Sequence, residues 1–304
     1  MATETPEKHR TEIVLVLLAL LTLALLVVMF VLCMPYMGPR TLSAEPTVTA
    51  VLTEATETTE AAETTEEATT PETLEPTVPP DKNPVGRHDF QYNSNNYLLL
   101  QRGESYPGID VSAFQGDIDW QQVAESGIEF AMIRLGYRGY GTAGTLVEDE
   151  YARDNLIEAR EAGLDIGAYF FSQATSIEEV DEEIEFLLGI LGDTHLNMPI
   201  VFDWEYISDT ARTAHVDART LTDCTLHFCE VMDEKGYEPM VYFNWHQSSH
   251  MLYLHELEDY PFWLALYTDR MIYPYKVEMW QYTSKGRVPG IQGDVDINVF
   301  MPRL

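Results

Sequence analysis

The chain has few basic residues for its length. Of its 304 residues, 18 are Lys or Arg and 50 are Asp or Glu, so the formal charge at pH 7 is −32. This imbalance argues against nucleic acid as a partner and against a polybasic attachment to anionic lipid. An acidic polymer would be repelled at long range as well, so a polymeric ligand has to be held by short-range contacts.

The chain also has few cysteines, and they form no disulfide framework. Cys33 lies in an apolar segment, whereas Cys224 and Cys229 lie five residues apart in a predicted helix. That spacing separates the two side chains by about 140° around the helix axis, which is a poor arrangement for a bond between them. A large domain whose core is sufficient without disulfides fits this pattern.

No residue pattern points to a metal or a cofactor. His246, His250 and His255 are irregularly spaced, and no Cys-His pairing, phosphate-binding Gly loop or Gly-x-Ser-x-Gly elbow accompanies them. We therefore expect neither a metal nor a cofactor.

A long apolar run lies close to the N-terminus. After a short polar segment, 1–12, residues 13–34 are apolar enough and long enough to cross a bilayer as one helix. Lys8 and Arg10 precede this run and only Arg40 follows it closely, which predicts a cytoplasmic N-terminus and an extracellular remainder. A cleaved signal peptide is the alternative, but its apolar region would be shorter and no small-x-small cleavage site follows.

Residues 35–85 alternate Thr, Glu, Ala and Pro and contain almost no large apolar side chain. Such a segment cannot bury enough surface to offset chain entropy, so we predict a disordered stalk that is extended by self-repulsion. Residues 86–105 lie directly before the predicted folded domain, and we assign them no function. Within them, Tyr97–Leu100 has the composition of an added strand.

Residues 106–304 form the predicted folded domain, in which short apolar runs alternate with amphipathic helices. The predicted strands are Gly108–Ala113, Glu129–Leu135, Asp165–Phe171, Pro199–Glu205, Glu238–Asn244, Pro261–Tyr267, Val277–Tyr282 and Gln292–Val299. The predicted helices are Asp119–Glu125, Leu146–Ala162, Ile177–Leu191 and Asp217–Lys235. Short apolar runs bounded by Gly, Pro or Asp are typical of strands buried on both faces. We therefore predict an α/β barrel whose last third contains little helix.

Acidic residues stand at the ends of several predicted strands, where barrel enzymes build their sites. The fourth strand ends in Asp203 and Glu205, which share one side because strand side chains alternate. Two close carboxylates raise one pKa, so one group can donate a proton while the other stays ionised, as glycosidic cleavage requires. Asp110 in the first strand and Asp296 in the last would join them, because these strands adjoin in a closed barrel.

Aromatic residues gather at the same strand ends. Sugar rings present apolar faces that stack on aromatic side chains regardless of charge, and core packing is the alternative role for each residue. We predict sugar contacts from Tyr169, Phe171, Trp204, Tyr267, Trp280 and Tyr282.

Residues 107–304 resemble the glycoside hydrolase family 25 lysozymes, also called Chalaropsis-type muramidases. The resemblance is carried by ordered motifs, which are Gly108–Ser112, Phe130–Gly136, Gly167–Phe171, Asp203-x-Glu205, Trp280–Tyr282 and Val295–Asn298. It implies a (β/α)5(β)3 barrel that cleaves the β-1,4 bond between N-acetylmuramic acid and N-acetylglucosamine in peptidoglycan.

The resemblance also implies a role for each acid. Glu205 matches the proton donor of the family. Asp203 matches the acid that orients the 2-acetamido group of the substrate if that group is the internal nucleophile, and direct attack by a carboxylate is the competing scheme. Asp110 and Asp296 match the two outer acids of the site.

Two alternatives stay open. Acetamido-assisted chitinases also end a barrel strand in Asp-x-Glu, but their longer motif has further acids where this chain has Val201 and Met198. A catalytically inactive module that binds wall glycan is the second alternative, and the retention of all four acids argues against it. We expect a monomeric peptidoglycan hydrolase, anchored by a single-pass helix in the cell membrane of a Gram-positive bacterium with its catalytic domain outside.

Overall fold

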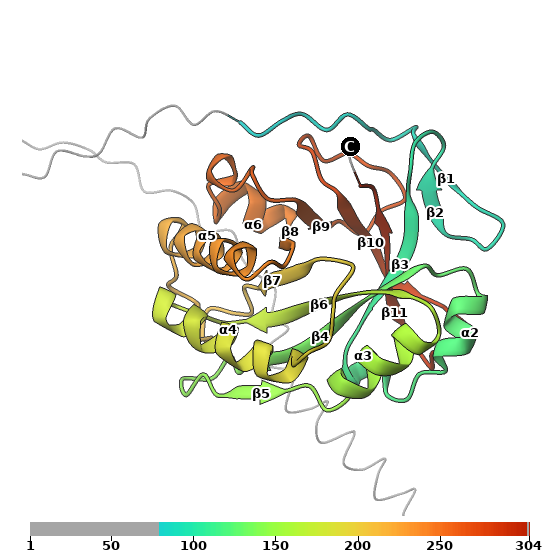
Figure 1. The fold of residues 1–304 in the computed structure, drawn as a ribbon. Helices are drawn as coiled ribbons and strands as arrows, with labels where there is room; N and C mark the ends of the chain where they lie inside the picture. The colour runs from blue at the N-terminus through green and yellow to red at the C-terminus, as the bar shows by residue number, and fades with distance from the viewer. Residues whose placement is uncertain (1–78, 303) are drawn as a thin grey trace, which may run out of the picture. The chain divides into compact units, whose positions relative to one another are not determined.

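The computed structural model describes residues 79–302 and 304 (Figure 1). The predicted N-terminal segment 1–12, the predicted transmembrane helix 13–34 and most of the predicted stalk lie outside the described residues. In the described part of the chain, no helix is both long enough and apolar enough to cross a bilayer.

Eight strands close into a barrel, which confirms the predicted α/β barrel. They are β3 (Tyr106–Val111), β4 (Phe130–Arg138), β6 (Asp165–Ser172), β7 (Ile200–Trp204), β8 (Pro239–Asn244), β9 (Phe262–Ala265), β10 (Met279–Gly286) and β11 (Val295–Phe300). Neighbours in this order pair with each other, and β3 pairs with both β4 and β11, which closes the ring. The pairs from β3 to β10 are parallel, whereas β11 runs antiparallel to β10 and to β3.

A helix follows each of the first five barrel strands. These helices are α2 (Trp120–Glu125), α3 (Ala152–Glu161), α4 (Ile177–Leu191), α5 (Ala218–Glu234) and α6 (Trp245–His250). Side-chain caps begin three of them: Asp119, Asp217 and Asn244 each accept a hydrogen bond from a backbone N–H of the first turn. In the part of the chain described here, β9, β10 and β11 follow one another without an intervening helix, as predicted for the last third.

The structure differs from the prediction at three places, and one of them is the short helix α6, which is not among the predicted helices. The predicted helix Leu146–Ala162 begins only at Ala152, because Leu146–Glu148 is strand β5 and pairs with the extended end of β4. The predicted added strand at Tyr97–Leu100 is present as β2 (Leu98–Leu100). It pairs with β1 (Phe90–Tyr92) in a separate hairpin and not with the barrel.

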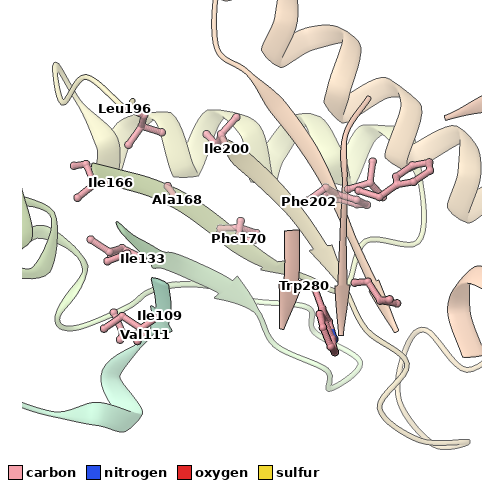
Figure 2. Close-up of a cluster of buried hydrophobic side chains, with 14 of the residues drawn as sticks. Ile109, Val111, Ile133, Ile166, Ala168, Phe170, Leu196, Ile200, Phe202 and Trp280 are labelled. Atoms are coloured by element: carbon pink, nitrogen blue, oxygen red, sulfur yellow. The ribbon is translucent and has the colours of Figure 1, made fainter. Parts of the chain in front are cut away.

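Alternation along each strand produces two apolar layers. Side chains that point outward form the core between the barrel and its helices, and Figure 2 shows Ile133 of β4 and Phe170 of β6 in this layer. Side chains that point inward, such as Tyr169 and Val201, fill the barrel itself. Gly108 leaves room for that filling, because a Cβ at this position would lie 2.3 Å from the Phe130 ring. Which layer a strand residue joins therefore decides whether it can reach the barrel mouth.

Candidate active site

A cavity of about 210 Å³ lies at the end of the barrel where the parallel strands have their carboxyl termini. All four predicted acids line it, and so do three of the predicted aromatic residues: Asp110, Asp203, Glu205, Asp296, Tyr169, Phe171 and Tyr267. Residues from the first, third, fourth, sixth and last barrel strands, or from just beyond them, thus meet in one cavity.

Asp203 and Glu205 are held by the backbone on which they stand. Asp203 is the fourth of the five residues of β7, and Glu205 follows the strand directly. The side-chain amide of Gln173, just beyond β6, donates to the carbonyl of Glu205 over 2.6 Å. The amide of Gln247, on α6 beyond β8, donates to the carbonyl of Trp204. Both glutamines are buried, so the end of β7 is fixed from both of its neighbouring strands.

The antiparallel direction of β11 brings Asp296 to the same cavity. Asp296 stands at the start of its strand, not at its end, and lies opposite Asp110 in the β3–β11 register. Oδ2 of Asp110 accepts hydrogen bonds from the amides of Gln281 and Asn298, each over 2.8 Å. These bonds connect Asp110, on β3, to β10 and to β11.

Aromatic hydrogen bonds support the two amides in turn. The hydroxyls of Tyr242 and Tyr267 donate to Oε1 of Gln281 over 3.3 and 3.1 Å. The indole N–H of Trp263 donates to Oδ1 of Asn298 over 2.8 Å. Since each amide oxygen is occupied by a donor, each amide nitrogen points toward the carboxylate of Asp110.

Burial raises the pKa of all four acids, and neighbouring carboxylates raise it further for Asp203, Glu205 and Asp296. The pKa of Asp110 rises to about 6, chiefly because of burial, although its two amide hydrogen bonds oppose the change. The pKa of Asp296 rises to about 8, through burial and then the charges of Asp110 and Glu205. The pKa values of Asp203 and Glu205 are raised as well, first by burial and then by neighbouring carboxylates. The site can therefore hold carboxylic acid protons near neutral pH.

Two carboxylate oxygens in this cavity have no hydrogen-bond partner among the described residues. Oδ1 of Asp203 and Oδ1 of Asp296 are buried, and neither accepts a hydrogen bond from any described residue. A buried polar atom without a partner costs folding free energy, which a ligand that donates a hydrogen bond recovers. Both oxygens are thus free to bind a donor group of a substrate.

Arg134 is the one basic residue among the described residues that line the cavity. Its guanidinium is held by Asp149, with two contacts of 2.8 Å, and Asp149 also accepts from the backbone N–H of Ala113. Arg134 also lies 5.2 Å from the centre of the Phe114 ring. Its charge lowers the pKa of Asp203 and so opposes the effect of the surrounding acids.

Three of the predicted aromatic residues lie outside this cavity, which corrects their selection as sugar contacts at these carboxylates. Trp204 and Trp280 are buried in the outer layer, and their indole N–H groups donate to the carbonyls of Ala174 and Leu266. Tyr282 is buried in the same layer, where its hydroxyl accepts from the backbone N–H of Leu98. Because side chains alternate along a strand, each of these residues is adjacent to an inward-pointing one and must itself point outward.

Sequence reasoning missed several residues that line the cavity or support it. Period-two alternation within each strand is the signal that could identify those on the strands, once one residue of that strand is known to point inward. The missed residues are Ser112, Phe114, Gln115, Arg134, Tyr242, Trp263 and Gln281 in the lining, and Gln173, Gln247 and Asn298 behind it.

Comparison with known proteins decides the family. The profile described as Glycosyl hydrolases family 25 matches residues 109–291, which is more than half of the chain. The chain belongs to glycosyl hydrolases family 25. The resemblance noted from the motifs is confirmed, and the protein is a glycoside hydrolase.

Individual relatives of this family 25 hydrolase agree with that assignment. The uncharacterized protein YegX of Escherichia coli is 30% identical over 232 residues, which cover 70% of this chain and 76% of YegX. Lysozyme M1 of Streptomyces globisporus is 28% identical over 203 residues, which cover 64% of this chain and 67% of that lysozyme.

A solved structure extends the comparison to the fold. The modular autolysin LytC of Streptococcus pneumoniae, in complex with a synthetic peptidoglycan ligand, superposes with a TM-score of 0.58 at 25% identity. The match covers 73% of this chain and 52% of LytC, so the family 25 hydrolase corresponds to about half of that autolysin.

The raised pKa of Asp296 predicts how stability depends on pH. The native state holds this proton up to about pH 8, whereas the unfolded chain releases it near the ordinary value of 3.8. The native state therefore binds more protons between these values, and stability falls as pH rises through them. Asp296→Asn should remove this loss, so the variant should melt at a higher temperature than the wild type at pH 8.5 and at the same temperature at pH 3.5.

Calorimetric melting curves from pH 3.5 to 9 would test this prediction. The exposed Asp117 provides the control, because Asp117→Asn should follow the wild type at every pH. Equal melting temperatures for Asp296→Asn and the wild type at pH 8.5 would contradict the prediction.

Proposed function

We propose that the chain hydrolyses the β-1,4 bond between N-acetylmuramic acid and N-acetylglucosamine in bacterial peptidoglycan. The observation that carries the proposal is the convergence of four acids with raised pKa on one cavity in a family 25 hydrolase. Relatives that are named as lysozymes, and an autolysin solved with a peptidoglycan ligand, support this substrate.

Glu205 is the proposed general acid. It is partly exposed at the end of β7, where burial and the charge of Asp110 raise its pKa above the ordinary value. A carboxyl group that keeps its proton near neutral pH can transfer that proton to the departing glycosidic oxygen. The resulting carboxylate can then accept a proton from the water that completes hydrolysis.

Asp203 is the proposed partner of the substrate's 2-acetamido group. Its buried Oδ1, which accepts no hydrogen bond from the described residues, suits the acetamido N–H as a donor. Held in this way, the acetamido oxygen attacks the anomeric carbon while the glycosidic bond breaks and the Glu205 proton goes to the leaving oxygen. Water then opens the cyclic intermediate from the opposite face, with overall retention of configuration.

Asp110 and Asp296 are the proposed outer acids of the site. Asp110 is fixed by two amides, and its charge, when it is ionised, raises the pKa of Glu205. Asp296 has a buried Oδ1 that can accept from a substrate hydroxyl or N–H. The cavity-lining Tyr169, Phe171 and Tyr267 are the proposed stacking contacts.

Replacing the general acid tests this assignment. Glu205→Gln should reduce kcat on purified peptidoglycan about 10²- to 10⁴-fold, because the amide cannot donate the required proton. Binding of the glycan should persist, since the amide has nearly the shape of the acid. Clearing of wall suspensions measures turnover. Borohydride reduction of the new ends should give muramitol, whereas glucosaminitol would identify a glucosaminidase.

The same variant separates the enzyme from its alternatives. If the wild type clears no wall and Glu205→Gln binds glycan equally well, the domain is a binding module. If the wild type cleaves chitin oligosaccharides faster than peptidoglycan, a chitinase-like activity is favoured.

The acetamido-assisted scheme predicts a dependence on N-acetylation. Glycan strands whose muramic acid lacks the acetyl group should resist cleavage, because the internal nucleophile is missing. Asp203→Asn should lower kcat on fully acetylated strands. Cleavage of the de-N-acetylated strands, or a covalent glycosyl adduct on Asp203 in a mass spectrum, would instead favour direct attack by the carboxylate.

We also propose that residues 1–85 attach the enzyme to the cell membrane. The apolar run 13–34 and the Thr- and Glu-rich segment 35–85 support a single-pass anchor with an extended stalk. A tether of this kind keeps the barrel at a high local concentration beside the wall.

Cell fractionation tests this attachment. The full chain should stay in the membrane pellet after a high-salt wash. Replacing residues 1–40 by a cleavable signal peptide should move the enzyme into the medium. Recovery of the unaltered chain in the medium would contradict the anchor.

A further inference from the structure

A second cavity of about 510 Å³ adjoins the active-site cavity. It lies between the β1–β2 hairpin, the segment after β9 and the second half of β10, with Arg287 just beyond that strand. Tyr267 lines both cavities, with 59% of its surface exposed. Ile297, which follows the acid Asp296, also lines the second cavity. A polymer that leaves the carboxylates past Tyr267 therefore enters this space.

The hairpin wall of the second cavity is firmly attached to the barrel. The ring of Phe90 packs edge-on against Trp280 with centroids 5.1 Å apart. The backbone N–H of Leu98 donates to the hydroxyl of Tyr282 over 3.2 Å, and the hydroxyls of Tyr97 and Ser126 lie 2.8 Å apart. The first two contacts involve outward-pointing side chains of β10, Trp280 and Tyr282, so both residues hold the hairpin in place. Tyr282 also lines the second cavity.

The exposed groups of this cavity are mostly neutral and polar or aromatic. Tyr92 stands on the hairpin with 49% of its surface exposed, and Tyr267 stands on the other wall. Asn96 at the hairpin turn, Thr268 and Thr283 add an amide and two hydroxyls. Exposed aromatic faces together with neutral hydrogen-bonding groups suit sugar rings.

Charged groups in the second cavity largely balance. The guanidinium of Arg287 lies 2.8 Å from the carboxylate of Asp294. The carboxylate of Asp269 lies close enough to Tyr92 to raise its pKa, after the larger effect of partial burial. Lys285 is exposed on the same wall. The charges balance once Asp294, which does not line the cavity, is counted with Asp269, Lys285 and Arg287, and this balance favours a sugar over the carboxylates of a peptide.

We propose that the second cavity is an additional sugar subsite, in which Tyr92 and Tyr267 bind a ring of the glycan strand beyond the cleaved linkage. The proposal rests on the proposed function, since it assumes a glycan polymer in the adjoining cavity. Residues 92–97 lie before the segment matched by the family profile, so this subsite is a property of the N-terminal hairpin of this chain. Its effect is to favour long strands over short oligosaccharides.

Defined glycan strands without stem peptides test the proposal in the full-length protein. For Tyr92→Ala, the ratio of kcat/KM on an octasaccharide to kcat/KM on a tetrasaccharide should fall about tenfold, equivalent to about 1.4 kcal/mol. Tyr92→Phe should keep the wild-type ratio, because it keeps the aromatic face. Gln91→Ala is the matched control, since Gln91 is an exposed neighbour on β1 that does not line the cavity.

Binding in a Glu205→Gln background separates this proposal from the proposed function. There, adding Tyr92→Ala should weaken binding of the octasaccharide about tenfold, whether or not the wild type turns it over. An unchanged length ratio together with unchanged binding would overturn the subsite, even if the enzyme is a muramidase. Weakening that occurs only on strands carrying stem peptides would overturn the sugar assignment and indicate a peptide in the cavity.

Discussion

The candidate site depends on the insertion of one antiparallel strand between two parallel ones. Strand β11 lies between β10 and β3, and its reversed direction places Asp296 at the mouth beside Asp110. The same strand supplies Asn298, whose amide joins that of Gln281 on Oδ2 of Asp110. Hydrogen bonds to a carboxylate contribute about 1.5–3 kcal/mol each. The pairing of β11 with β3 therefore both closes the barrel and orients the carboxylate of Asp110.

The four buried acids lower the stability of the fold unless neighbouring groups hold them in place. Buried carboxylates resist ionisation, and here the charges of Asp110, Glu205 and Asp296 each raise the pKa of another of the acids. The protein keeps them in place with amides on backbone carbonyls and with a single guanidinium. Gln173 and Gln247 fix the strand end that bears Asp203 and Glu205, while Arg134 offsets part of the negative field. This arrangement fits the general observation that catalytic groups are held at some expense in stability.

Much of this architecture was predictable from local patterns. Short apolar runs gave the eight barrel strands, and period-two alternation put Asp203 and Glu205 on one side. The same alternation, applied one residue further, excludes Trp204 from the barrel mouth, and it excludes Trp280 and Tyr282 once Gln281 is known to point inward. Proximity to a motif does not decide which way these three aromatic side chains point.

Other features depend on contacts between elements, which the pattern within one element does not reveal. Strand β5 exists because the end of β4 offers it a partner, so Leu146–Glu148 became a strand and not the first turn of a helix. The hairpin β1–β2 is stabilised by side chains nearly 200 residues away in the chain. The place of Arg134 in the cavity cannot be predicted from its own strand, because its contacts with Asp149 and Phe114 form only in the folded barrel.

The β1–β2 hairpin and β11 limit how far the protein can be truncated. A fragment cut to the span matched by the family profile, 109–291, would end before the eighth barrel strand and lose Asp296 with it. It would also uncover the indole of Trp280, against which Phe90 now packs. The span matched by the family profile is therefore smaller than the folded barrel with its hairpin, and expression boundaries belong outside both flanking elements.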